Sequence, residues 1–157
     1  MKSWPQALQD GLLTGSIASV CSATVLALCG KIESGSAAGP NNGPSQWIWG
    51  EGAAYVRRAT WRNTAVGYAI HHATSIFWAT LHEKLLRSQN VKESNVSLVA
   101  KGAATAALAC FVDYQVTPRR LQPGFDKQLS RGSLFFVYAA FALGLALGAQ
   151  VIRRRAA

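Results

Sequence analysis

Apolar positions along the chain gather in four long stretches in which charged side chains are nearly absent. The stretches cover residues 11–29, 64–81, 96–116 and 133–152. Each holds about 18–21 residues, enough for an α-helix to cross a hydrocarbon core of about 30 Å. A helix of a soluble bundle carries a charged stripe, but residues 11–29 and 133–152 contain no charge. The pattern predicts an all-α, polytopic membrane protein, a single domain (1–157) built as a bundle of four transmembrane helices.

The longest link between these stretches covers residues 30–63. Its first part, SGSAAGPNNGPSQ, is dense in Gly, Pro, Ser and Asn, which predicts turns and no helix. Aromatic side chains suited to a membrane–water interface follow, namely Trp47, Trp49, Tyr55 and Trp61. We expect a short interfacial helix over Ala53–Arg62 that runs into the second span. The functional alternative for this link is a binding loop.

Small residues recur at intervals of about four within three of the stretches. They are Gly11, Gly15 and Ser19 in the first, Gly102, Ala106 and Ala109 in the third, and Ala140, Gly144 and Gly148 in the fourth. Lipid gives helices no hydrophobic reason to associate, so they need close backbone contact or polar side chains between them. The spacing therefore predicts a compact bundle or a homo-oligomer.

The chain is strongly basic, with 16 Lys and Arg against 7 Asp and Glu. The basic residues lie at the ends of the stretches, as in RRR at 153–155, which favours anionic lipid headgroups over nucleic acid. They divide almost evenly between the two ends, so the positive-inside rule does not fix the orientation. We expect cytoplasmic termini, because RRR adjoins a span and the link 30–63 has the composition of an exported loop. The first stretch is longer than a signal-peptide core, which favours an uncleaved anchor.

The second stretch and its end hold every histidine of the chain, His71, His72 and His82. On a helix, Tyr68, His72, Ser75 and Glu83 share one face, and His71 and His82 share a neighbouring one. Polar stripes inside membranes normally face protein or water.

The third stretch offers partners for this polar face. If it packs antiparallel beside the second, Lys101 comes near Glu83 as an ion pair, and Asp113 comes near Tyr68, with Arg119 and Arg120 as alternative partners. The candidate polar intramembrane site therefore comprises Tyr68, His71, His72, Ser75, Glu83, Lys101 and Asp113.

The residues of this site bear on three chemistries: metal binding, haem binding and catalysis. Adjacent His71 and His72 point about 100° apart, so they cannot share one ion on a regular helix, and no HExxH motif is present. A metal would need Asp113 or Cys110 from another span, and bis-histidine haem would need a second copy of the chain. No catalytic motif appears. We expect no catalytic residue, metal or cofactor, with His71, His72 and Ser75 bonding between helices and His82 at the interface.

Three segments resemble small, uncharacterised integral inner-membrane proteins of proteobacteria. They are NNGPSQWIWG (41–50), GYAIHHATSIFWATLHE (67–83) and VDYQVTPRRLQPGF (112–125). The resemblance implies a four-span protein of the bacterial inner membrane, and it brings no assigned activity and no functional residues.

The leading functional hypothesis from the sequence is a non-enzymatic accessory or scaffold protein. Its partners would be the lipid bilayer and a second copy or another membrane protein, and not nucleic acid. The alternative is a protein that handles protons or a small solute through the polar stripe, followed by a haem- or metal-binding membrane protein.

Overall fold

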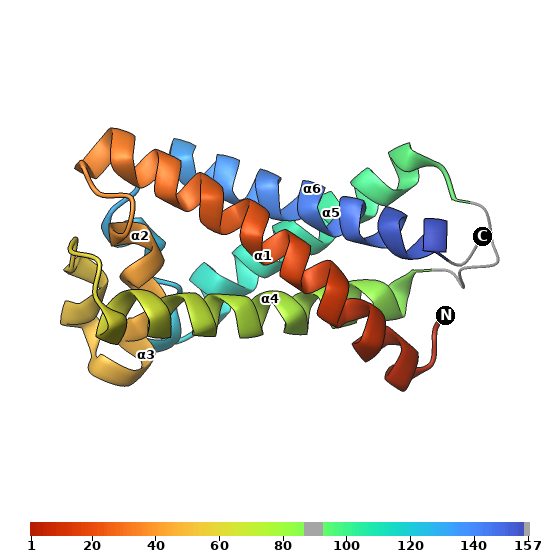
Figure 1. The fold of residues 1–157 in the computed structure, drawn as a ribbon, viewed down its shortest axis with the longest axis horizontal. Helices are drawn as coiled ribbons and strands as arrows, with labels where there is room; N and C mark the ends of the chain where they lie inside the picture. The colour runs from red at the N-terminus through yellow and green to blue at the C-terminus, as the bar shows by residue number, and fades with distance from the viewer. Residues whose placement is uncertain (87–92, 156–157) are drawn as a thin grey trace.

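The computed structural model describes residues 1–86 and 93–155, and within these ranges every regular element is a helix. The four longest are α1 (Trp4–Ser34), α4 (Val66–Leu85), α5 (Asn95–Phe111) and α6 (Arg131–Arg155). Figure 1 shows them as an elongated bundle, with the start of α1 and the end of α6 at the same end of the molecule. The predicted all-α fold class is confirmed.

Short helical elements connect the long ones at the opposite end of the bundle. They are α2 (Gly39–Asn42), η1 (Gly43–Ser45), α3 (Gln46–Trp49), η2 (Glu51–Tyr55), η3 (Trp61–Ala65), η4 (Val112–Val116), η5 (Arg119–Leu121) and η6 (Phe125–Lys127). The prediction that residues 34–46 lack helix is wrong, because Pro40 and Pro44 stand at first-turn positions, where proline favours a helical turn.

The helix expected over Ala53–Arg62 is also absent. The chain leaves the η2 turn at Val56 in an extended conformation, and Thr60 is extended as well. The Thr60 hydroxyl oxygen accepts a hydrogen bond from the Asn63 backbone N–H at 3.1 Å, so it caps a new helical segment that leads into α4.

Within the part of the chain that the structure describes, three helices are long and apolar enough to cross a membrane: Trp4–Ser34, Asn95–Val116 and Arg131–Arg155. The second of these is α5 continued by the π-helix η4. Large apolar side chains lie exposed on their outer surfaces, among them Leu12, Val20, Leu28, Leu108, Phe111, Phe136, Leu143 and Leu147. Helix α4, which contains the second predicted span, is not among the three, because its histidines and Glu83 make it less apolar.

Helix α1 contacts both α6 and α4, and Figure 1 shows it running diagonally from beside α6 to across the end of α4. A methyl group on Gly15 would lie 2.6 Å from the Ile76 Cα of α4, and one on Gly148 of α6 would lie 2.6 Å from the Thr14 Cα. The small residues thus allow the close backbone approach that their spacing predicts. Since α1 packs on α4 and α5 packs on α6, the antiparallel packing of the third span beside the second, on which the expected partners of the polar face depend, is limited to a few contacts.

Candidate functional site

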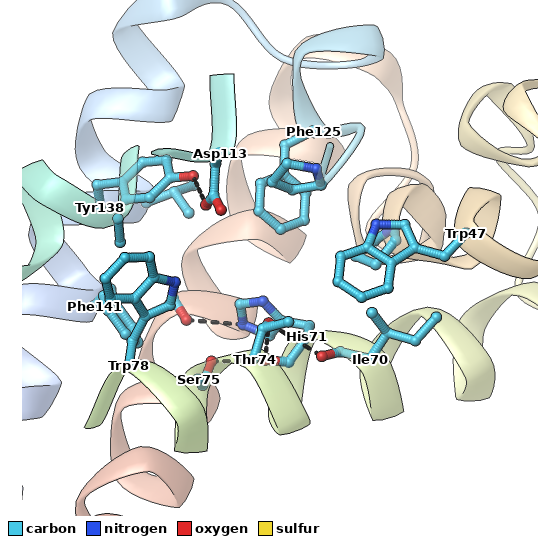
Figure 2. A pocket seen from close by; sticks show the side chains of 15 residues that line it. Trp47, Ile70, His71, Thr74, Ser75, Trp78, Asp113, Phe125, Tyr138 and Phe141 are labelled. Carbon is cyan, nitrogen blue, oxygen red and sulfur yellow. Dashed lines mark hydrogen bonds between the residues drawn. The ribbon is translucent and has the colours of Figure 1, made fainter. Parts of the chain in front are cut away.

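A cavity of about 50 Å³ lies where α1, α4, η4 and α6 meet two connecting segments, the one between α1 and α4 and the one between η4 and α6. Figure 2 shows its lining, in which polar groups stand among aromatic rings. Its polar side chains are Ser22, His71, Thr74, Ser75, Asp113 and Tyr138. Side chains from four elements far apart in the sequence therefore converge on one small volume.

The cavity contains one carboxylate, that of Asp113. The Tyr138 hydroxyl donates a hydrogen bond to Asp113 Oδ2 at 2.6 Å. Asp113 lies in η4, where the helix that continues α5 widens to a π-helix, a feature that often accompanies functional sites. The partners expected for Asp113 were Tyr68, Arg119 or Arg120, and the structure gives it Tyr138, because α6 rather than α4 is the neighbour of α5.

His71 lines the cavity opposite Asp113 (Figure 2). Its Nε2 lies 3.0 Å from Ser22 Oγ, and the Ser22 hydroxyl donates to the Ala18 carbonyl at 2.8 Å. Because the Ser22 hydroxyl proton is donated to the Ala18 carbonyl, His71 Nε2–H is the donor to Ser22 Oγ. Ser75 instead donates to the His71 carbonyl of its own helix at 2.7 Å, so it does not bond between helices as expected.

Aromatic side chains form much of the wall: Trp47, Trp78, Phe125, Tyr138 and Phe141. The His71 and Phe125 rings meet edge to face, with centroids 5.7 Å apart. Trp47 was expected at the membrane surface with Trp49 and Trp61. The latter two are exposed, but Trp47 turns inward towards the cavity.

The position of Trp47 is fixed by the connecting segments. Its indole N–H donates to the Gln122 carbonyl at 3.2 Å, and the Gln46 amide donates to the same carbonyl at 2.6 Å. The neighbouring Gly124 has φ +74°, and its backbone lies close to Gly43, where a larger residue would be strained. One carbonyl therefore joins the two segments that close this end of the cavity.

His72 and Tyr68 do not line the cavity. His72 Nδ1 lies 2.9 Å from Ser19 Oγ, and the Tyr68 hydroxyl lies 3.4 Å from the same oxygen. Both side chains thus bond to α1, as does His71, but at a different serine. The prediction that His71 and His72 face different directions and bond between helices is confirmed.

Glu83 belongs to a second buried cluster, at the other end of α4. It accepts hydrogen bonds from Lys2 and, at 2.6 Å, from the Thr14 hydroxyl, and Lys2 also contacts Asp10 at 2.7 Å. The predicted ion pair of Glu83 with Lys101 is wrong, because α4 packs on α1. Lys101 pairs with Glu93.

His82 was expected at the membrane surface, but it is buried, with 1% of its surface exposed. Its Nδ1 lies 2.9 Å from Thr105 Oγ1 of α5, and the Thr105 hydroxyl donates to the Lys101 carbonyl. The ring therefore donates to Thr105, and its buried Nε2 has no hydrogen-bond partner among the described residues. Of the seven candidate residues, three line the cavity (His71, Ser75 and Asp113), and the others lie outside it.

No group of three or more His, Cys, Asp or Glu side chains suited to a metal ion occurs in residues 1–86 and 93–155. Comparison of the chain with protein-family models, curated proteins and solved structures gave no match. The site must therefore be interpreted from its own geometry. Ser22, Tyr138 and Phe125 were missed from the sequence because nothing distinguishes them from ordinary packing residues.

Proposed function

We propose that this chain is a four-span integral membrane protein that binds a small solute in the cavity formed by His71, Asp113 and Tyr138. The proposal rests on the observation that these three side chains come from three helical segments and face one partly open cavity walled by aromatic rings. Small-molecule sites are typically concave and mostly apolar, with a few convergent polar groups.

The distribution of side chains on α4 supports its role as a membrane span in addition to the three apolar helices. Its 20 residues reach about 30 Å, which matches the hydrocarbon thickness. Its outward stripe is apolar, at Ala69, Ala73 and Phe77, while its histidines and Glu83 turn towards other helices. A helix of low overall hydropathy is accommodated in a bilayer when its polar side faces protein.

The α1–α4 interface favours binding in a cavity over conduction along the polar stripe. The cluster at His71 and His72 and the cluster at Glu83 are separated by a closely packed stretch. There, Gly15 lies against the Ile76 backbone and Gly11 lies against Thr80. A chain of water or protons along this interface would have to pass through backbone contacts that leave no room for a methyl group.

The bacterial inner membrane and cytoplasmic termini remain part of the proposal, supported by the resemblance and by the common end of α1 and α6. Single cysteines at Glu51 and Ser94, in a variant without native cysteines, test the four-span arrangement in intact vesicles. We expect an impermeant maleimide to label the two positions from opposite sides. Labelling of both from one side contradicts four spans.

Tryptophan fluorescence tests solute binding, because Trp47 and Trp78 line the cavity. The protein, reconstituted in lipid nanodiscs, is titrated with a panel of small cations, anions and neutral amides. We expect at least one class to change the emission saturably, and the change to persist in Trp49→Phe, which alters an exposed ring outside the cavity. If no class gives a saturable change, the proposed function is wrong.

One observation favours the scaffold hypothesis as a second candidate. The outer side of α5 is uncovered over most of its length, with Val99, Ala103, Ala107 and Phe111 exposed. Small side chains let another membrane helix approach closely. Crosslinking from a cysteine at Ala103 in native membranes, followed by purification, tests this candidate, and an absence of any crosslinked species contradicts it.

A further inference from the structure

We infer that the cavity takes an organic cation, with a small alkylammonium group seated between Asp113 and the aromatic wall. This inference rests on the proposed solute-binding function and adds the chemical class of the solute. It joins three independent features of the site: the sign of its charge, the nature of its walls and its size.

The charge of the lining is the first feature. Among the described residues that line the cavity, Asp113 is the only acidic side chain, and there is no lysine or arginine. The Tyr138 hydroxyl donates to Oδ2, and no ion pair joins Asp113 to any other residue in the described ranges. A partly buried carboxylate without a cationic partner is costly, and a bound cation supplies that partner.

The aromatic wall is the second feature. The faces of indole, phenol and benzene rings attract cations, and tryptophan attracts them most strongly. Trp47 and Trp78 belong to the lining together with Phe125 and Phe141. Cages of several aromatic rings recognise alkylated ammonium groups, because such cations are weakly hydrated and fill an apolar space.

The volume of the cavity is the third feature. A cavity of about 50 Å³ exceeds the roughly 10–15 Å³ that one water molecule needs, so it accommodates a group of a few heavy atoms. A methylated ammonium group has this size. An anion would face the Asp113 carboxylate, and a divalent metal ion would find too few ligands, since Asp113 and His71 are the only strong donors.

Titration calorimetry in nanodiscs tests the inference with a matched series of probes. Trimethylammonium and choline are compared with 3,3-dimethylbutan-1-ol, the neutral counterpart of choline, and with acetate. We expect the cations to bind at least tenfold more tightly than the neutral alcohol, and acetate not to bind. Equal binding of choline and the alcohol, or preferred binding of acetate, overturns the inference but leaves solute binding intact. Binding of no probe in calorimetry overturns the inference.

Two variants locate the cation. Asp113→Asn keeps the shape of the side chain and removes its charge, so choline affinity should fall at least tenfold. Asp126→Asn removes an exposed carboxylate at the same end of the bundle and should leave affinity unchanged. Unchanged affinity in the Asp113 variant, or an equal loss in both, contradicts the assignment.

A third pair of variants keeps the test decisive if Asp113→Asn does not fold. Trp47→Leu removes an aromatic face and keeps an apolar wall, whereas Trp47→Phe keeps an aromatic face. We expect choline affinity to drop several-fold in the leucine variant and to be largely retained in the phenylalanine variant. Equal affinity in the two variants shows that the ring face does not hold the cation.

Discussion

Lys2 and Glu83 form an ion pair that joins the beginning of the chain to the end of α4, with 3% of Lys2 and 0% of Glu83 exposed. The pair lies 81 positions apart in sequence. Asp10 and Thr14 complete the cluster, so Lys2 and Glu83 each have two partners. The second residue of the sequence is therefore buried by its ion pair with the end of α4.

Glu83→Gln should destabilise the fold strongly, because it leaves the Lys2 ammonium buried with less compensating charge. Breaking a buried pair costs about 3–5 kcal/mol, and the contact of Lys2 with Asp10 keeps the cost near the lower figure. Denaturant titration of the purified protein measures the free energy of unfolding. The double variant Lys2→Met, Glu83→Leu should regain much of the loss. A single variant as stable as the parent contradicts the buried pair.

Gly15→Ala should weaken the packing of α1 on α4, because the added methyl group would lie 2.6 Å from the Ile76 Cα. Overpacking of this kind costs about 1–3 kcal/mol. Gly52→Ala is the matched control, since no atom lies within 4 Å of the added group. Thermal unfolding of the two variants should differ clearly, and equal melting temperatures would show that the helices are not in close contact here.

Thr105→Val should destabilise the contact between α4 and α5. The change leaves the His82 Nδ1–H buried without an acceptor, which costs about 1–3 kcal/mol. Thr24→Val serves as the control, because the Thr24 hydroxyl is exposed and bonds only to its own helix. Unfolding free energies distinguish the two, and a smaller loss in Thr105→Val than in Thr24→Val is incompatible with the contact.

Tyr138→Phe should lower solute affinity. It removes the hydroxyl that orients Asp113 but keeps the ring in the wall of the cavity. We expect affinity for choline to fall three- to tenfold, and the melting temperature to fall as well, because Asp113 loses its hydrogen-bond donor. Tyr55→Phe, at an exposed tyrosine, should change neither quantity. Unchanged affinity in the Tyr138 variant would mean that Asp113 needs no orientation from this hydroxyl.

The apolar stretches predicted the long helices well, because the period and length of an apolar run are local properties. The partners of those helices are not local. Gly15 indicated close packing without indicating that Ile76 would be its neighbour, and Glu83 was assigned to Lys101 on a wrong pairing of spans. Hydropathy ranks helices by how apolar they are, and it carries no information about adjacency.

The candidate site was predicted in part for the same reason. His71 and Asp113 stand out in the sequence as polar residues in apolar surroundings. Tyr138 does not, because one tyrosine in an apolar run has many possible roles. Trp47 was assigned to the membrane surface from its residue type alone, but in the structure it lines the cavity and bonds to the Gln122 carbonyl.

The central position of α1 bears on how the chain matures during synthesis. Helix α1 precedes its two main partners, α4 and α6, in the chain, and α6 ends at residue 155. Until α4 has been synthesised, Ser19 and Ser22 of α1 lack the histidines that later bond to them. The packing around α1 is therefore complete only when α6 has been synthesised. Truncation before α6 should leave α1 open to degradation.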